Sequence, residues 1–509
     1  MSVAVPSRTA ISLACAAGLL PAAPAAALTA DALWQAWQDQ ATESEQEITA
    51  AETSRDGDAL TLSGVRSRVT YPDGSATVML DRIVLTEQDD GSVTVDPSPV
   101  TRLTTEAAPE DGESSTTEIE IATTDLSLVA RGQPPEIDYQ VEAGGVDITL
   151  TSMTVDGEPV EVEAGATMTG LSGDYLVESG DGTGNPATTG QMSVDAVALA
   201  ATGADDEGTG FSLEATYEDV AVESFGTGGL FGNADALVSR DVTAGGAYSY
   251  GATSSRFSVE GPEGGTLATQ SEGGRSEYDL SDGNLTVDGA MRNMTFTAES
   301  PQLPGPPVEA SIDEIATRFT FPLAPSDEQR DIALMLNLDG LTVDDQLWAM
   351  VDPQGILPRT PARLKLDLAG RMTLNEALSE IDPEDESAAT FDSLTIRELE
   401  LGFAGAELSG DGDLTFQAPS DDAAEPPEGT DDMIPAAPPM PEGQINLTLS
   451  GANALMDDLV TLGVLPEDQV MGARMMLGLF AESVGDDLLR SRIRLGPDGQ
   501  VTANGQRIR

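Results

Sequence analysis

The chain of 509 residues carries 88 acidic residues against 24 basic ones, which gives a formal net charge of −64. This excess excludes nucleic acid as a partner, because nucleic-acid binding requires clustered Lys and Arg, and it disfavours docking on an anionic membrane. The chain has no histidine, and its single cysteine is Cys15. Catalysis by a Ser-His-Asp or Cys-His set, zinc or haem ligation through His or Cys, and disulfide formation are therefore excluded for the rest of the chain.

Residues 1–27 have the pattern of a cleaved export signal. Arg8 precedes an apolar run from Ala10 to Leu20, and Ala25 to Ala27 form a small-residue cleavage site. The apolar run is too short to span a bilayer, which takes about 20 residues. We expect cleavage after Ala27, export to the periplasm, and no transmembrane segment in a mature chain of 509 − 27 = 482 residues.

Cys15 raises the alternative of a lipid anchor. The segment Ser12-Leu13-Ala14-Cys15 lacks an aliphatic residue three places before the cysteine, and only about six apolar residues would remain as the signal core. We therefore expect no lipoprotein anchoring at Cys15.

The first element expected after the signal is a helix. Thr29 can cap it, and Asp31 lies in its first turn, where a negative charge is favourable. Its apolar positions follow at helical spacing: Leu33, Trp34, Trp37 and Ala41. We expect this helix to pack on the end of a sheet and shield an edge; a partner-binding helix is the alternative.

From residue 58 onward the dominant pattern is alternation of apolar and polar residues, which predicts half-buried strands. The clearest runs are Leu60/Leu62, Val93/Val95, Val146/Ile148/Leu150, Val160/Val162, Leu285/Val287, Leu334/Leu336/Leu338, Leu364/Leu366/Leu368 and Ile445/Leu447/Leu449. Asp-Gly pairs that suit tight hairpin turns recur at residues 73–74, 90–91, 156–157, 282–283, 339–340 and 498–499. Such strands pair with their sequence neighbours, so we expect antiparallel meanders whose apolar face meets a second sheet, curls on itself or covers something else.

Aromatic residues are scarce, with 3 Trp, 7 Tyr and 11 Phe. We therefore expect a core of aliphatic residues and alanine, and no prominent aromatic groove for stacking on sugars.

Two further helices are expected near the C-terminus. Leu455, Leu459 and Leu462 form one apolar stripe, and Pro466 is placed to start the second helix. The apolar positions of that second helix are Val470, Met471, Met475, Leu479 and Phe480. Methionine adapts to irregular apolar ligands, but we interpret this helix as part of the core.

Proline-rich segments divide the chain. Pro301 to Pro307 and Pro353 to Pro361 are expected to be turns or short connectors, and residues 419–443 a disordered, Pro- and acid-rich linker or loop. We therefore divide the mature chain into a β-rich region with its N-terminal helix at 28–418, the linker at 419–443, and a strand-helix-helix-strand segment at 444–509. Because strand patterns resume at Ile445, we expect this last segment to belong to the same architecture.

No motif identifies a reaction. Lys365 is the only lysine and position 362 is Ala, so a Ser-x-x-Lys dyad and a Walker A loop are both absent. Paired carboxylates could serve a hydrolase, but with 88 acids no pair can be preferred. The acidity also fits divalent-cation binding, although no EF-hand or calcium-binding repeat is present. We assign no catalytic, cofactor-binding or metal-binding residue and expect no cofactor.

Both ends of the mature chain resemble one family. The segments are LTADALWQAWQ at Leu28–Gln38, DALTLSGV at Asp58–Val65, LDRIVLTEQDDGSVTV at Leu80–Val95, LPEDQVMGARMMLGLFAE at Leu465–Glu482 and DGQVTANGQ at Asp498–Gln506. Together they resemble the domain of unknown function 2125 family of exported alphaproteobacterial proteins. The resemblance implies a periplasmic setting and supplies no site residues.

These observations predict a mainly β protein, built as an extended antiparallel sheet that forms an open curved sheet or a sandwich, with one N-terminal helix and two helices near the C-terminus. The function expected is non-catalytic: an envelope scaffold, or a binder of an apolar or amphiphilic, lipid-like ligand on the apolar face of the sheet. The alternatives are a carboxylate-based hydrolase and an acidic cation-binding protein. The sequence does not indicate an oligomeric state.

Overall fold

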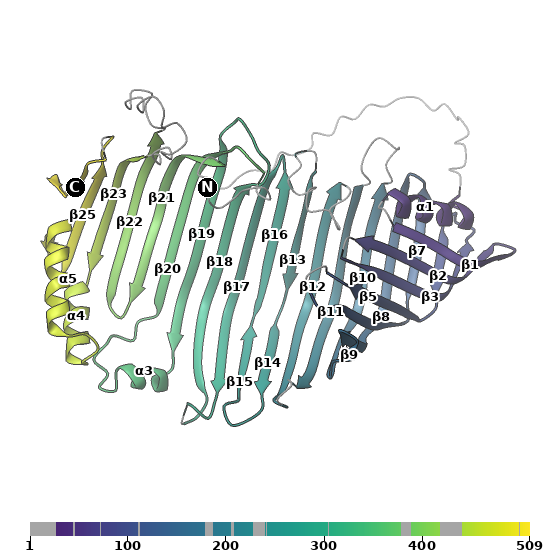
Figure 1. Ribbon diagram of the computed structural model, residues 1–509, viewed down its shortest axis with the longest axis horizontal. Coiled ribbons are helices and arrows are strands. Elements are labelled where there is room, and N and C mark those ends of the chain that lie inside the picture. Colours follow the sequence, from purple (N-terminus) through teal and green to yellow (C-terminus); the bar gives the residue numbers. More distant parts are fainter. Residues whose placement is uncertain are drawn as a thin grey trace, which may run out of the picture.

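The computed structural model describes residues 27–43, 46–71, 73–109, 112–178, 187–204, 208–227, 240, 242–303, 305–377, 388–417, 440–497 and 499–508. These residues form one antiparallel sheet of 27 strands and four helices (Figure 1). The prediction of a mainly β, antiparallel fold is confirmed. None of the helices in these residues is long and apolar enough to cross a bilayer.

The sheet is a meander in sequence order, since each long strand pairs with the strands before and after it. Two strand pairs are interrupted, so that β4 and β5 follow one another along β3, and β13 and β14 follow one another along β12. The first half of the sheet contains β1 (Gln46–Asp56), β2 (Ala59–Tyr71), β3 (Gly74–Glu87), β4 (Val93–Pro97), β5 (Val100–Ala107), β6 (Ser115–Thr124), β7 (Ser127–Gln133), β8 (Glu136–Val155), β9 (Glu158–Pro159), β10 (Val162–Glu178), β11 (Ala187–Ala204), β12 (Gly210–Thr227), β13 (Ala244–Tyr250) and β14 (Thr253–Val259).

The second half continues the same pairing to the C-terminus. It contains β15 (Gly265–Ser271), β16 (Gly273–Ser281), β17 (Asn284–Glu299), β18 (Val308–Pro322), β19 (Arg330–Val343), β20 (Ala362–Leu374), β21 (Ala389–Phe403), β22 (Ala406–Gln417), β23 (Met440–Ser450), β24 (Glu482–Gly485), β25 (Leu488–Leu495), β26 (Val501–Ala503) and β27 (Gln506–Arg507). The expected linker falls mostly outside the described residues, and β23 begins at Met440 and pairs with β22.

The helices are α1 (Ala30–Glu43), α3 (Asp345–Val351), α4 (Ala452–Thr461) and α5 (Glu467–Phe480). Three of them lie where predicted: Thr29 Oγ1 accepts the N–H of Ala32 at 3.2 Å at the start of α1, and Pro466 directly precedes α5. The interpretation of α5 as a core helix is wrong, because Met471 and Met475 are 63% and 74% exposed. Helix α3 was missed, because it has only seven residues and no buried side chain. Its signal is Asp344, whose carboxylate accepts the N–H of Leu347 as an N-cap.

The Asp-Gly pairs at 73–74, 90–91, 156–157 and 282–283 lie at hairpin turns, as predicted. The pair Asp339-Gly340 does not, because both residues lie inside β19, and Gly340 has a φ of +72°. Asp498 lies outside the described residues. The error has a physical reason: a left-handed residue is needed there within a strand, not at its end.

Gly340 belongs to a line of left-handed residues that crosses the sheet, which we call the seam. Its members are Gly64, Asp125, Gly170, Asp219, Gly273, Asn293 and Gly340. A left-handed residue interrupts the strict alternation of a strand, as in a β-bulge. The apolar positions accordingly change parity there, for example from Leu338 to Leu341 in β19 and from Tyr217 to Val220 in β12.

The apolar side chains on both sides of the seam lie on one face. Tyr217 on β12 packs edge-to-face against Tyr250 on β13, with ring centroids 5.7 Å apart, although the two residues lie on opposite sides of the seam. The seam therefore keeps the apolar side chains of each strand on the same surface along its whole length. We call this surface the inner face, because α1 and α5 both pack against it.

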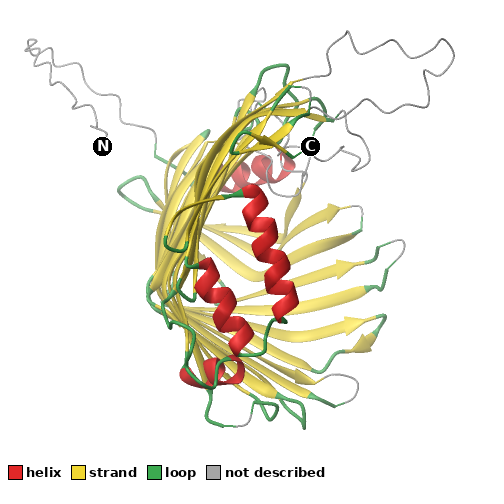
Figure 2. Ribbon diagram, turned by 90° about the vertical axis from the view of Figure 1, so that its left-hand side faces the viewer, coloured by secondary structure: helices red, strands yellow, loops and turns green. Residues whose placement is uncertain are grey.

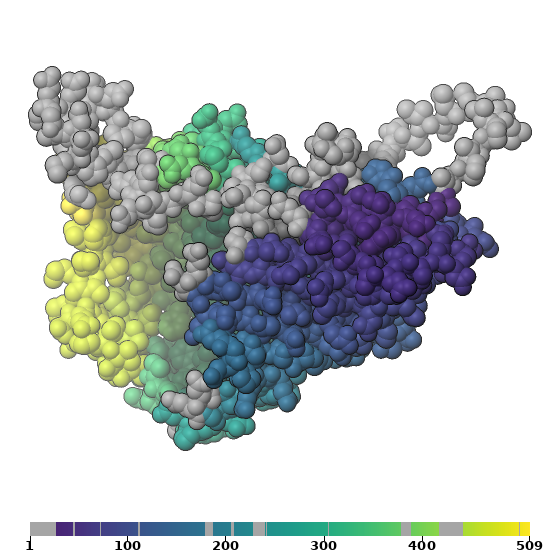
Figure 3. Space-filling view, turned by 45° about the vertical axis from the view of Figure 1, so that its right-hand side comes forward, coloured from purple at the N-terminus to yellow at the C-terminus, as the bar shows by residue number. Residues whose placement is uncertain are grey.

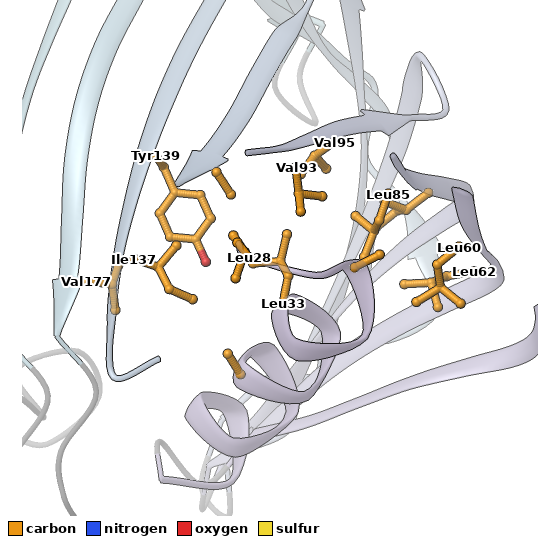
Figure 4. Packing of buried hydrophobic residues seen from close by; sticks show 14 of the residues in the cluster. Leu28, Leu33, Leu60, Leu62, Leu85, Val93, Val95, Ile137, Tyr139 and Val177 are labelled. Atoms are coloured by element: carbon orange, nitrogen blue, oxygen red, sulfur yellow. The ribbon is translucent and has the colours of Figure 1, made fainter. Parts of the chain in front are cut away.

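The inner face is covered at its N-terminal end. The first strands curl so that Leu62 on β2 and Ile137 on β8 join one buried cluster, with Leu33 of α1 between them (Figure 4). Leu33 and Leu62 are fully buried. Trp37 on α1 also donates its indole N–H to the hydroxyl of Tyr139, at 2.9 Å.

At the C-terminal end, α5 lies over the inner face. Leu477 and Phe480 of α5 face Leu408, Leu447 and Ile493, and together they line an apolar cavity of about 210 Å³. Figure 2 looks from this end and shows a single curved layer of strands, with α4 and α5 in the foreground on the inner side of the curve. Between the two ends a broad hollow stays open, seen in Figure 3 between the purple and blue N-terminal part and the yellow C-terminal part.

Candidate functional site: the open inner face

The inner face is uncharged across the middle of the sheet. Two adjacent rows of paired residues cross it from β8 to β25 without an Asp, Glu, Lys or Arg. The first row is Tyr139, Tyr175, Gly190, Ser224, Gly246, Tyr278, Val287, Phe319, Leu334, Leu368, Ile396, Gly412, Ile445 and Ile493. The second is Val141, Gly173, Met192, Val222, Tyr248, Ser276, Gly289, Thr317, Leu336, Leu366, Leu399, Gly410, Leu447 and Ser491.

The row between these two points to the opposite face and is rich in charge. From β8 to β21 it reads Gln140, Asp174, Gln191, Glu223, Ala247, Glu277, Asp288, Arg318, Met335, Asp367 and Glu398. Over the middle strands the charged side chains are thus segregated: they lie on the outer face, and these two rows of the inner face have none. This follows directly from the alternation of a strand, which sends successive side chains to opposite faces.

Large apolar side chains of the inner face are left exposed between the two covered ends. Tyr278 is 46% exposed, and Phe319 and Leu334 are each 42% exposed. Single exposed apolar residues are common, but a contiguous apolar surface is typical of a binding site. The question left open by the sequence, whether this face is closed or open, is answered by these residues: it is open over the middle strands.

The exposed part has two chemically different halves. On β8 to β16 the face is formed by tyrosine and glycine, which we call the tyrosine–glycine floor: Tyr175, Tyr217, Tyr248, Tyr250 and Tyr278 with Gly190, Gly246 and Gly274, and Tyr139, which is buried at its covered edge. From β17 to β21 it is formed mainly by leucine, isoleucine and phenylalanine, which we call the aliphatic floor: Phe319, Leu334, Leu336, Leu364, Leu366, Leu368 and Ile396.

The glycines of the tyrosine–glycine floor make room for tyrosine rings from the neighbouring strands. A Cβ on Gly246 would lie 2.9 Å from Cε1 of Tyr278, and one on Gly274 would lie 2.6 Å from Cζ of Tyr250. A ring that crosses a glycine covers its backbone and presents a flat surface. Six of the seven tyrosines of the chain lie on this floor. The expectation that no aromatic surface is prominent is therefore wrong, because the tyrosines are spread over 140 residues of sequence and only the meander brings them together.

Four phenols of this floor have a raised pKa and are neutral at physiological pH. Burial raises the pKa of Tyr139 to about 12, while the hydrogen bond from Trp37 has a smaller, lowering effect. Burial also raises the pKa of Tyr175, Tyr248 and Tyr250. Of the six phenol hydroxyl groups, only that of Tyr139 forms a hydrogen bond with a side chain of the described residues. The floor thus offers uncharged hydroxyl groups beside apolar ring faces.

The carboxyl groups whose pKa the fold shifts most clearly have structural roles. Glu87 accepts the N–H of Ala30 at the start of α1, and this bond, with Arg55, lowers the pKa of Glu87. Asp344 is the N-cap of α3, and the N–H of Leu347 lowers its pKa. A carboxylate at a helix N-terminus satisfies a backbone donor and interacts favourably with the helix dipole.

Asp352 and Asp487 follow the same rule in more buried surroundings. Desolvation pushes both pKa values upward, but hydrogen bonds from backbone N–H groups bring them below the ordinary value. For Asp352 these donors are Ile356 and Leu357, and for Asp487 they are Asn453 and Ala454 at the start of α4. None of these four carboxyl groups has the raised pKa that a general acid requires.

The outer face carries a separate groove of about 770 Å³. Asp174, Glu223, Glu277 and Asp279 line it together with the apolar Leu176 and Phe225, and Arg318 pairs with Asp288 at 2.5 Å. Within the described ranges, no three Asp, Glu, His or Cys side chains are grouped closely enough to hold a metal ion. The groove therefore combines acidic and apolar side chains, without a formed metal site among those residues.

In comparisons with known proteins, no family model, no curated protein and no solved structure matches the chain.

Proposed function

We propose that this protein is a non-catalytic periplasmic protein that binds an apolar or amphiphilic, lipid-like ligand on the open inner face of its sheet. The observation that carries the proposal is the segregation described above: an uncharged face with exposed Tyr278, Phe319 and Leu334, backed by an acidic outer face. Covering this apolar surface is favourable by about 25 cal/mol per Å² removed from water. A ligand with a hydrocarbon portion is the simplest means of covering it.

The setting rests on the sequence. An export signal at residues 1–27 and the resemblance to the domain of unknown function 2125 family support a periplasmic protein, where lipids in transit between membranes would need shielding from water. A non-catalytic envelope scaffold is the variant in which the face is covered by another protein.

The alternatives have weaker support. A carboxylate-based hydrolase requires one carboxyl group with a raised pKa beside an ionised partner. Glu87, Asp344, Asp352 and Asp487 instead have lowered pKa values. A cation-binding protein requires several oxygen ligands close together. The acids of each row on the outer face lie on different strands, one strand spacing or more apart.

The test is native mass spectrometry of the protein purified from the periplasm of its own cells. We expect additional mass that organic solvent extracts and that a lipid analysis identifies. Only bare polypeptide, together with no binding of the fluorescent apolar probe N-phenylnaphthylamine to the purified protein, would refute ligand binding.

A pair of variants locates the site. Leu334→Asp places a charge on the inner face and should abolish binding of the probe. Phe225→Asp makes the same kind of change at a residue that is 44% exposed on the outer face of β12, and binding should be unchanged. Equal effects of the two variants would contradict a site on the inner face.

A further inference from the structure

The two floors of the inner face differ in chemistry, and the difference indicates what kind of amphiphile the face holds. The aliphatic floor offers only hydrocarbon contacts, whereas the tyrosine–glycine floor adds hydroxyl groups to flat ring faces. A ligand that matched only the aliphatic floor would need no such second surface. The inference below rests on the proposed function.

Charge decides what the tyrosine–glycine floor can accept. Its rows contain no cationic side chain, and the neighbouring row on the outer face contributes Asp174, Glu223 and Glu277. An anionic head group would find no partner there and would be repelled by the acids behind the sheet. A cationic head group would be attracted by the same acids and by the tyrosine rings, at the cost of its desolvation on an uncharged surface. Charge therefore excludes an anionic head group, and the choice of an uncharged one rests on the phenol hydroxyl groups.

Geometry adds a requirement for hydroxyl groups. The ring of Tyr278 lies beside Gly246 and that of Tyr250 beside Gly274, each in the space that a Cβ on the glycine would fill. The ring centroids of Tyr248 and Tyr250 are 5.4 Å apart and the two rings are tilted against each other, so two phenols lie side by side. Tyrosine combines an apolar ring with a hydroxyl that both donates and accepts hydrogen bonds. A sugar ring has the matching surface, with C–H groups on its face and hydroxyl groups at its edge.

The direction of the ligand follows from the order of the rows. Tyr278 on β16 is followed on the next strands by Val287, Phe319 and Leu334. Three strand spacings of about 4.8 Å cover roughly 14 Å, which is close to half the hydrocarbon thickness of about 30 Å of a bilayer, the length of one acyl chain. Three of the four side chains along this path, those of Tyr278, Phe319 and Leu334, are exposed.

We propose that the inner face binds a glycolipid-like amphiphile in one orientation, with an uncharged, hydroxyl-rich head group on the tyrosine–glycine floor and its hydrocarbon chain over Phe319 and Leu334. The raised pKa values of Tyr248 and Tyr250 are consistent with this, since the phenols remain hydrogen-bond donors throughout the physiological pH range.

The experiment compares three surfactants with the same ten-carbon chain below their critical micelle concentrations: decyl glucoside, decylphosphocholine and decanoate. Isothermal titration calorimetry on the full mature protein measures each Kd. We expect decyl glucoside to bind about tenfold more tightly than decanoate, since two or three head-group hydrogen bonds of about 0.5–1.5 kcal/mol each suffice for that factor. Equal affinities of the wild-type protein for the three surfactants would overturn the inference.

Variants assign the two halves. Tyr248→Ala and Tyr278→Ala should remove the preference for decyl glucoside and leave decanoate binding nearly unchanged, and Tyr248→Phe should have an intermediate effect because the ring remains. Leu334→Asp should weaken the binding of all three surfactants. Phe225→Ala, on the outer face, is the matched control, and circular dichroism checks that each variant keeps its strands.

The outcomes separate this inference from the proposed function. If no surfactant binds, or if Leu334→Asp changes nothing, the proposed function fails. If the surfactants bind and Leu334→Asp weakens them, but the tyrosine variants weaken all three equally, the proposed function holds and the head-group assignment is wrong.

Discussion

Leu62 on β2 and Leu334 on β19 lie on the same inner face, and each belongs to a run with leucine at every second position. Leu62 is nevertheless fully buried, whereas Leu334 is 42% exposed. The difference lies in what covers each residue. Around Leu62 the sheet curls and α1 fills the curl, while in front of Leu334 no helix or strand of the described chain is packed. The closed end therefore provides stability, and the open middle is the part that is available for a ligand.

The largest effect is expected from a matched pair of side-chain truncations, one in each region. Leu62→Ala should lower the free energy of unfolding by about 2–5 kcal/mol, because it removes a fully buried side chain from a packed cluster. Leu334→Ala should cost less than about 1 kcal/mol, as expected for a partly exposed position. Urea denaturation followed by circular dichroism measures both. Similar losses would mean that the middle of the sheet is covered in solution.

Alkaline titration separates a closed tyrosine from an open one. The pKa of Tyr139 is about 12 in the folded protein, against 10.0 for an ordinary tyrosine. A raised folded-state pKa means that its contribution is complete below pH 10 and is lost as the pH rises from about 10 to about 12, because the unfolded chain releases the proton first. The loss should be about 2–3 kcal/mol. The pH dependence of urea unfolding over this range measures it.

The control for that titration is Tyr139→Phe. This variant should be less dependent on pH between 10 and 12 than the wild-type protein. If the two curves coincide, the burial of Tyr139 by α1 is not the cause of the effect.

The seam offers a test of how the two regions come to share one face. Gly170 has a φ of +64°, and a Cβ there would collide with the carboxylate of Asp195 on the neighbouring strand. Gly170→Ala should lower the free energy of unfolding by about 1–3 kcal/mol. Gly157→Ala is the matched control, since Gly157 has a φ of +79° in a turn and nothing within 4 Å of the added Cβ.

The difference between these two variants reports the collision with Asp195 alone. Adding Asp195→Ala to Gly170→Ala should recover part of the loss. No recovery in thermal or urea unfolding would show that only the left-handed backbone matters at this position.

The smallest effect is expected at the anchor of α1. Glu87 accepts the N–H of Ala30 at 2.9 Å and pairs with Arg55. Because its pKa is lowered in the folded protein, its contribution is present above the ordinary value of 4.5 and is lost as the pH falls through the folded-state value. Glu87→Gln should cost about 0.3–1 kcal/mol at pH 7.

That small difference should shrink as the pH falls through the folded-state pKa of Glu87, because the carboxyl group of the wild-type protein then becomes neutral as well. Thermal unfolding of both proteins along an acid titration measures it. A difference that does not change with pH would mean that the charge of Glu87 is not what holds the start of α1.

The strands were predictable because their chemistry is local. Leu334, Leu336 and Leu338 recur at every second position, and any register that buries one of them on a face brings the others to the same face. Helices α1, α4 and α5 were predictable for a similar reason, since caps and apolar spacing are read within a single segment. Helix α3 has neither the length nor the apolar stripe.

The functional face was not predictable in the same way. Coverage depends on how far the sheet curls, which is a property of many strands together, so the alternation at Leu62 and at Leu334 looks the same in sequence. The tyrosine–glycine floor has a partial signal: glycines at 190, 246 and 274 within strands, where glycine has no side chain to pack. What was missing is the register that places Tyr278 beside Gly246 and Tyr250 beside Gly274.

The meander has a consequence for how such a protein changes in length. Because the long strands pair with strands that are close in sequence, a hairpin could be gained or lost as a unit, and its neighbours would need only to re-form the same edges. Each added hairpin would widen the hollow by two strand spacings, roughly 10 Å. Duplication of a short coding segment would therefore be enough to enlarge the inner face.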